Sequence, residues 1–129
     1  MFHALRRRLT RTLDSPLLSR RLASSSNNQT TTLAYELQGD SVAGEKKNLF
    51  IIHGLLGQGR NWRTFGRRLR GALGEDDWRV FLVDLRGHGK SSSVRGGPNT
   101  VTTAALDVNN LADSLGAHPD VVVGHSLGG

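Results

Sequence analysis

Cysteine is absent from this 129-residue sequence, which excludes disulfide bonds and thiolate metal sites. Aromatic residues make up only 5% of the chain, and no uninterrupted apolar run is long enough to cross a bilayer, so we expect no transmembrane segment. Glycine is frequent, with 16 residues. This balance suits a turn-rich α/β architecture better than a helical bundle. The length allows at most one modest domain.

The formal net charge of +6 is concentrated at the N-terminus. Residues 1–26 hold six arginines and one acidic residue, whereas the remaining residues hold 11 basic and 10 acidic groups. Nucleic-acid binding requires Lys and Arg gathered on one face of the folded part. The basic cluster at residues 63–70 alternates with apolar residues, which a solvated helix face explains more simply. We therefore expect no nucleic-acid partner.

The first 26 residues have the composition of an organelle import peptide. They are rich in Arg, Ser and Leu, and leucines recur every four residues from Leu5 to Leu17. On a helix this spacing separates the leucines from most arginines, the amphipathic cationic pattern of such peptides. We predict a transit peptide over residues 1–26 and a linker over 27–30, with a mitochondrial location as first choice and a chloroplast location as second. A disordered basic tail without a targeting role is the alternative.

From residue 31 onward, short apolar runs separated by turn signals indicate a domain over residues 31–129. Strand and helix patterns alternate, which predicts parallel strand pairing through crossover helices. The expected fold class is α/β, a mostly parallel sheet with flanking helices. The expected elements are an edge strand at 31–39, helices at 61–73 and 99–116, and strands buried on both faces at 48–54, 78–89 and 120–124. The second of these buried strands, at 78–89, ends in a glycine loop.

Both expected helices have an apolar face. In the first, the apolar stripe consists of Trp62, Phe65 and Leu69. In the second, Asn99 or Thr100 is available as the N-cap and Gly116 as the C-cap. The apolar face of this second helix comprises Val101, Ala104, Val108, Leu111 and Leu115.

The segment VVVGHSLGG, residues 121–129, predicts a strand that runs into a sharp serine turn. A serine hydroxyl is a poor nucleophile unless it projects above the sheet toward a base, and a tight strand-to-helix turn achieves this. Such a turn strains the serine backbone and leaves no space for side chains two residues to either side. Gly124, Ser126 and Gly128 meet these requirements, so Ser126 is the predicted catalytic nucleophile.

A serine hydrolase also needs two N–H donors for the oxyanion. One donor comes from the residue after the nucleophile, here Leu127. The other lies in the loop that leaves an earlier neighbouring strand, where HGLLG (residues 53–57) is found. Because Gly54 lets the backbone turn, the amide of Leu55 can point into the site. Leu55 and Leu127 are therefore the predicted oxyanion-hole residues.

With HGLLG, DLRGHGKS (residues 84–91) and GHSLGG (residues 124–129) in this order, the chain from about residue 31 resembles the N-terminal part of the α/β-hydrolase superfamily. With its import-like leader it is similar to mitochondrial, esterase-type abhydrolase domain-containing proteins. The resemblance implies Ser126 as nucleophile, Leu55 and Leu127 as oxyanion donors, and the 84–91 loop as a shaper of the pocket. It implies a small-molecule acyl or ester substrate, and no cofactor is expected.

In this superfamily the catalytic acid and histidine follow the nucleophile in sequence. No residue follows Gly129, so we expect a truncated chain that holds the N-terminal half of the fold and lacks the acid and base. An internal triad would have to combine Asp84 or Asp107 with His53, His88, His118 or His125, against the superfamily order. We expect instead that His53 and His88 bind loop carbonyls and that the Asp84 carboxylate anchors the following turn. No His and carboxylate cluster has metal-ligand spacing, so no metal site is expected.

Two functions are compatible with this pattern. The first is a serine-dependent hydrolase that forms an acyl-enzyme at Ser126. The second is a non-catalytic fragment, regulatory or interacting, that retains part of the fold. An epoxide or haloalkane hydrolase needs a carboxylate at the turn, which Ser126 disfavours.

Overall fold

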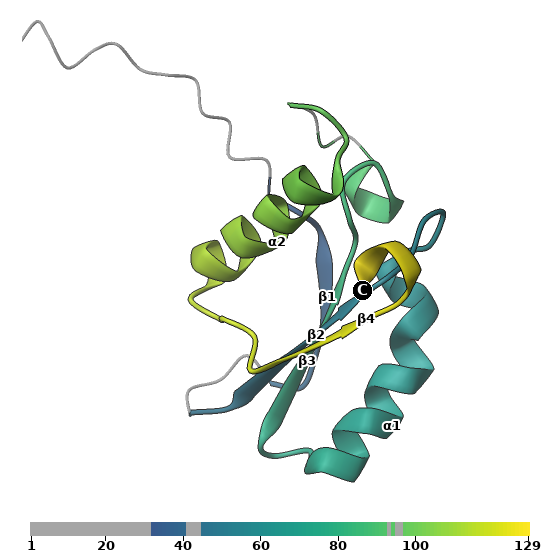
Figure 1. Cartoon of the computed structure of the whole chain (residues 1–129). Helices are drawn as coiled ribbons and strands as arrows, with labels where there is room; N and C mark the ends of the chain where they lie inside the picture. The colour runs from purple at the N-terminus through teal and green to yellow at the C-terminus, as the bar shows by residue number, and fades with distance from the viewer. Residues whose placement is uncertain (1–31, 41–44, 93, 95–96) are drawn as a thin grey trace, which may run out of the picture.

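The computed structural model describes residues 32–40, 45–92, 94 and 97–129, and the predicted transit peptide (1–26) and linker (27–30) lie outside these residues. One four-stranded sheet lies between two helices (Figure 1). The strands are β1 (Tyr35–Gln38), β2 (Lys47–Ile52), β3 (Trp78–Val83) and β4 (Val121–Gly124). The α-helices are α1 (Arg63–Leu73) and α2 (Val101–Leu115). The short 3-10 helices are η1 (Gly59–Trp62), η2 (Gly89–Ser91) and η3 (Ser126–Gly128).

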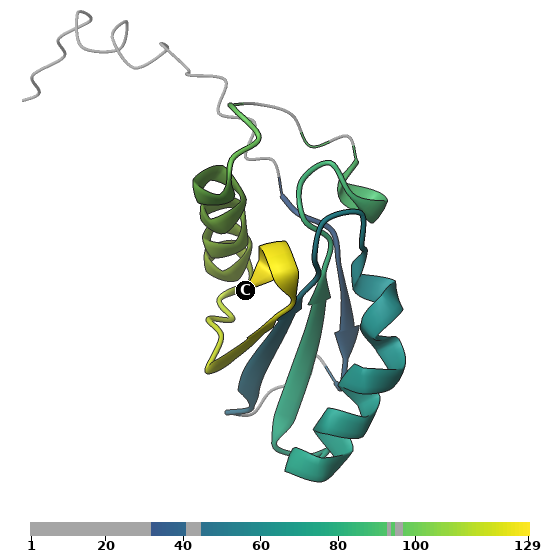
Figure 2. The ribbon, with the colours of Figure 1, turned by 45° about the vertical axis from the view of Figure 1, so that its right-hand side comes forward.

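The sheet has the order β1-β3-β2-β4. Strand β2 pairs in parallel with β3 and with β4, while β1 pairs antiparallel with β3. The predicted mostly parallel sheet with flanking helices is therefore confirmed. Since β3 and β4 lie on opposite sides of β2, crossovers of the same hand place α1 and α2 on opposite faces of the sheet. Figure 2 shows this three-layer arrangement.

The core is divided by the sheet into two parts, because successive strand residues point to opposite faces. On β2, Phe50 and Ile52 belong to the part that packs against α2, while Leu49 and Ile51 belong to the part that packs against Trp62 and Leu69. All four β2 side chains are buried. The prediction that β2 and β3 are buried on both faces is thus confirmed.

The predicted caps of α2 are also present. Thr100 is the N-cap residue, and its hydroxyl accepts a hydrogen bond from the Thr103 N–H at 3.1 Å. Gly116 ends the helix in the left-handed conformation, with φ of 58°. Of the predicted apolar face, Leu111 is fully buried.

Three burial predictions were wrong. Phe65 is 44% exposed because it points from the first turn of α1 into a surface cavity rather than onto the sheet. Val101 is 62% exposed at the first turn of α2, beyond the edge of the core. In β4, Val121 and Val122 are exposed because this strand lies at the edge of the described sheet.

Candidate active site

The three parallel strands end at the same level. Ile52 is in register with Val83 on one side and with Gly124 on the other. The loops that follow these residues therefore meet at one edge of the sheet, where η3 lies beside the loop after β2 (Figure 1). Because the chain leaves β2 toward β3 and later returns to the other side of β2, a crevice forms at this edge, where open α/β sheets bind ligands.

Ser126 has a strained backbone at this crevice. Its φ is 55°, in the left-handed region that residues other than glycine rarely adopt. Such strain costs about 1–3 kcal/mol and is concentrated at functional sites. The turn is tightly packed as well: a Cβ on Gly128 would meet the carbonyl oxygen of Ile52 at 2.5 Å, and a Cβ on Gly124 would collide with the Gly128 carbonyl.

The 53–57 loop lies directly against this turn. A Cβ on Gly54 would be 2.9 Å from the Cβ of Ser126 and 3.0 Å from the carbonyl oxygen of His125. The structure thus brings together two segments that are far apart in the sequence. Leu55 and Leu127 line one cavity of about 340 Å³ with Leu85, Val101 and Ala104.

The backbone N–H groups of Leu55 and Leu127 make no hydrogen bond within the described part of the chain. Nearby N–H groups are engaged: the Gly57 N–H donates to the Gly54 carbonyl, and the Gly128 N–H donates to the His125 carbonyl. The two predicted oxyanion donors are therefore not engaged in hydrogen bonds with the described residues.

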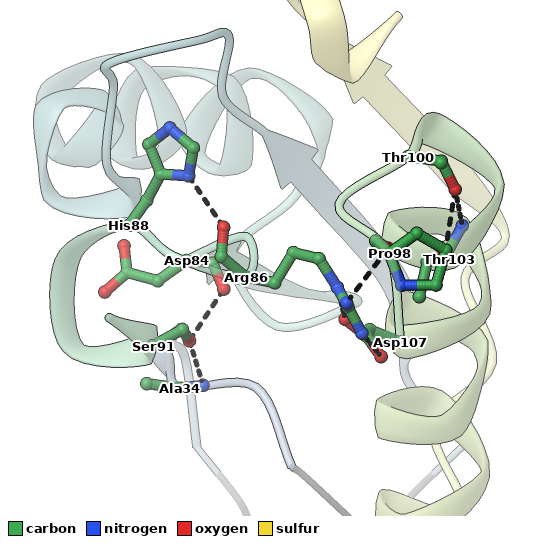
Figure 3. A network of polar contacts seen from close by, with 9 residues as sticks. All are labelled: Ala34, Asp84, Arg86, His88, Ser91, Pro98, Thr100, Thr103 and Asp107. Carbon is green, nitrogen blue, oxygen red and sulfur yellow. Dashed lines mark hydrogen bonds and ion pairs between the residues drawn. The ribbon is translucent and has the colours of Figure 1, made fainter. Parts of the chain in front are cut away.

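The 84–91 loop is braced by its own polar side chains (Figure 3). The Asp84 carboxylate accepts hydrogen bonds from the N–H groups of Gly59, at 2.6 Å, and Lys90, at 2.9 Å. This confirms that Asp84 anchors the turn. The Ser91 hydroxyl donates to the Asp84 carbonyl and accepts from the Ala34 N–H, each at 2.8 Å. The role of Ser91 was not predicted, although it is the final residue of the DLRGHGKS motif.

Arg86 and Asp107 form a buried, bidentate ion pair (Figure 3). The Arg86 Nε lies 2.6 Å from Asp107 Oδ2, and the Arg86 Nη2 lies 2.9 Å from Oδ1. The hydrogen bond that Arg86 donates to the Asp107 carboxylate raises the pKa of Arg86 above its ordinary value. Since both carboxylate oxygens are engaged, Asp107 holds the 84–91 loop on α2.

The imidazoles of His53 and His88 connect the loops after β2 and β3. His53 Nδ1 lies 2.7 Å from the Gly54 carbonyl oxygen and His88 Nδ1 lies 2.8 Å from that of Arg86, as predicted for both histidines. Each Nε2 accepts an N–H from the opposite loop, from Leu85 to His53 at 3.0 Å and from Leu56 to His88 at 3.2 Å. The rings are edge-to-face, 5.1 Å apart.

The other two candidate histidines form no hydrogen bond with the Ser126 hydroxyl among the described residues. The His125 ring faces Trp62 at 5.6 Å, and His118 lies 3.5 Å from Asp113 on the surface. Among the residues that the structure describes, no hydrogen bond joins Ser126 Oγ to a histidine. An internal Ser-His-Asp triad is therefore not formed by these residues.

A second cavity, of about 560 Å³, lies on the other side of the 53–57 loop. It is lined by Trp62, Phe65 and His125 as well as by Leu55 and Leu56. Leu56 was not singled out from the sequence, yet its φ is 62° and its side chain is 91% exposed. No sequence signal marks this residue, because leucine is rarely found in the left-handed region.

Neither described helix combines the length and apolar character needed to cross a membrane. Within residues 32–40, 45–92, 94 and 97–129, no group of three or more His, Asp or Glu side chains has the geometry of a metal site.

Residues 47–129 match the family described as having the alpha/beta hydrolase fold. The chain is 32% identical over 96 residues to an abhydrolase domain-containing protein of Schizosaccharomyces pombe, covering 74% of this chain and 33% of that protein. It is 33% identical over 97 residues to an sn-1-specific diacylglycerol lipase of Xenopus laevis, covering 75% of this chain and 29% of the lipase.

Among solved structures, an esterase of a marine microorganism is similar, with a TM-score of 0.60, 30% identity, and coverage of 75% of this chain and 33% of the esterase. The chain thus spans about a third of the length of the curated relatives it matches.

Proposed function

The chain belongs to the alpha/beta hydrolase fold family, and on this premise we propose that the protein is a serine-dependent hydrolase of carboxylic esters or other small acyl compounds. The proposal rests on one observation: Gly54 packs against Ser126, which has a left-handed φ of 55°. This packing joins the predicted nucleophile to the loop that carries a predicted oxyanion donor.

In the proposed reaction, Ser126 Oγ attacks the carbonyl carbon of the substrate and its proton passes to a base. The negative charge that develops on the carbonyl oxygen is stabilised by the N–H groups of Leu55 and Leu127. The bond to the alcohol then breaks, the alcohol leaves with a proton, and an acyl-enzyme remains. Water attacks this ester, releases the acid and restores the Ser126 hydroxyl.

The cavity beside Leu55 and Leu127 supports an acyl substrate. Its lining includes Leu85, Val101 and Ala104, so an apolar chain can be removed from water there. Two relatives are named as a lipase and an esterase, which also supports ester hydrolysis. The base is not assigned, because no described histidine is hydrogen-bonded to Ser126.

A fluorophosphonate probe tests the proposal, because it reacts with activated serines. We expect labelling at Ser126 that is lost in Ser126→Ala, with Ser114→Ala as a control that retains it. Labelling that persists in Ser126→Ala would contradict the assignment. A folded protein that neither reacts with the probe nor hydrolyses short-chain nitrophenyl esters would contradict hydrolysis by the described residues alone. That result is also the one expected of the second candidate, a non-catalytic interaction protein.

We further propose that residues 1–26 direct the protein to mitochondria, since they combine six arginines with regularly spaced leucines. Fusion of these residues to a fluorescent protein tests this, with the arginines replaced by glutamine as the control. Uniform cytosolic fluorescence of the unaltered fusion would contradict it, and chloroplast fluorescence would support the second choice.

A further inference from the structure

The carbonyl group of Gly54 is held by two hydrogen bonds. It lies 2.7 Å from His53 Nδ1 and accepts the Gly57 N–H at 3.0 Å. The His53 side chain and the Gly57 backbone therefore fix the direction of this carbonyl. The same peptide unit carries the N–H of Leu55, one of the two donors in the proposed mechanism.

The described residues contain no cis peptide bond, so the C=O and N–H bonds of the Gly54–Leu55 peptide point in opposite directions. When the carbonyl points toward the His53 ring, the Leu55 N–H points away from it. A flip of this peptide would break both hydrogen bonds and exchange the donor for a carbonyl oxygen. The orientation of the peptide thus decides whether the loop offers a donor or an acceptor.

We infer that His53 is a positioning residue for the oxyanion site, because its imidazole holds the Gly54–Leu55 peptide in the orientation that presents the Leu55 N–H. This inference rests on the proposed function of the Ser126 site. His53 does not touch the reacting atoms in this scheme. It acts through the Gly54 carbonyl.

The protonation state of His53 is determined by its second hydrogen bond. The Leu85 N–H can only donate, so His53 Nε2 must be the unprotonated acceptor at 3.0 Å. Nδ1 then carries the proton and donates it to Gly54. The side chain is only 1% exposed, which excludes competing water from both bonds. The 84–91 loop therefore selects the tautomer that orients the 53–57 loop.

His88 makes the reciprocal connection, from the loop after β3 to the loop after β2. Its Nε2 accepts the Leu56 N–H, so the next peptide of the same loop is also held. The two rings together fix consecutive peptides between Gly54 and Leu56. The strained φ of Leu56 fits this role, because the bond to His88 compensates for an unfavourable backbone conformation.

Two substitutions separate the hydrogen bonds of His53. Asn places its Nδ2 donor where Nδ1 is and can keep the bond to Gly54, whereas Gln places its Oε1 acceptor near Nε2 and can keep the bond to Leu85. We expect His53→Gln to lower the rate of fluorophosphonate labelling of Ser126, and kcat for ester hydrolysis, about tenfold to a hundredfold with little change in KM. We expect His53→Asn to retain the rates within about threefold, because the donor to Gly54 is preserved.

A surface histidine gives the matched control. His118→Gln alters a ring that lies near Asp113, before the start of β4, whereas Ser126 follows the other end of that strand, so labelling should be unchanged. Thermal unfolding of each variant separates loss of fold from loss of positioning. Equal rates in His53→Gln and the parent protein, at equal stability, would overturn the inference.

A readout without activity keeps this inference distinct from the proposed function. In ¹⁵N-labelled full chain, the imidazole shifts should show protonated Nδ1 and unprotonated Nε2 on His53, with a scalar coupling from Nε2 to the Leu85 amide nitrogen. The residual dipolar coupling of the Leu55 N–H should change in His53→Gln and not in His118→Gln. If Ser126 fails to react but these signals are present, the proposed function fails and the positioning of Leu55 stands. A His53 protonated at Nε2, or an unchanged Leu55 coupling in His53→Gln, would refute the positioning role.

Discussion

A side chain on Gly128 would begin 2.5 Å from the carbonyl oxygen of Ile52, the last residue of β2. It would also begin 2.7 Å from the carbonyl oxygen of His53. These oxygens belong to the backbone of the central strand and of the loop that follows it, so neither can move without distorting the strand or the loop. The turn that carries Ser126 therefore rests on β2 at a point where only a hydrogen atom fits.

Gly128→Ala should destabilise the protein by about 1–3 kcal/mol, because the added methyl group forces a backbone shift in a packed region. It should also abolish labelling of Ser126. Urea unfolding followed by tryptophan fluorescence measures the first effect. Gly71→Ala is the control, since its Cβ would meet only Glu75 Oε1 at 3.6 Å and a helical alanine adds about 0.5–1 kcal/mol of stability. If the free energy of unfolding and the labelling of Ser126 are unchanged in Gly128→Ala, the turn must lie farther from β2 than the structure shows.

Ser126→Gly should be more stable than Ser126→Ala by about 1 kcal/mol, because glycine adopts positive φ without the steric cost of a Cβ. Both variants lose the hydroxyl and should therefore lose labelling. Because neither variant has the hydroxyl, the difference in stability between them reports the backbone strain at position 126 alone. Chemical denaturation of the two variants side by side is the measurement, and equal stabilities would mean that Ser126 does not hold the φ of 55°.

Arg86→Ala should cost about 3–5 kcal/mol of unfolding free energy, because it leaves the Asp107 carboxylate buried without its partner. Arg86→Met combined with Asp107→Leu should recover much of this loss, since no buried charge remains. The exposed pair of Arg63 and Glu36 is the control: Arg63→Ala should lower stability far less than Arg86→Ala, because solvent screens this pair. Additive effects of the two substitutions at positions 86 and 107 would contradict the pairing.

Local sequence features predicted those parts of the structure that depend on local rules. The continuous apolar runs predicted the doubly buried strands β2 and β3, and Thr100 and Gly116 were predicted as caps from their side-chain and backbone preferences. The turn at Asp84 was predicted because a carboxylate at a strand end commonly binds the following N–H groups.

Features that depend on contacts between distant segments were not predicted. The pairing of Arg86 with Asp107 spans 21 residues, and that of Leu85 with His53 spans 32. Both depend on how far α2 and the loops extend past the sheet edge, which no local pattern specifies. Phe65 follows the helical period of Trp62 and Leu69, yet it lines a surface cavity while those two residues pack against the sheet.

Leu56→Gly should raise the stability of the protein by about 0.5–1 kcal/mol, even though it deletes a large apolar side chain. The Leu56 side chain is 91% exposed, so its removal sacrifices little packing, while its φ of 62° is strained for leucine. Leu56→Val should lower stability, because a β-branched side chain tolerates this region less well. Both effects require the Leu56 N–H to stay bonded to His88 Nε2, so His88→Ala should reduce the difference between the two variants. Urea denaturation of Leu56→Gly and Leu56→Val, each with and without His88→Ala, measures this coupling. A Leu56→Gly variant less stable than the parent protein would show that the exposed leucine is held by packing rather than imposed by the loop.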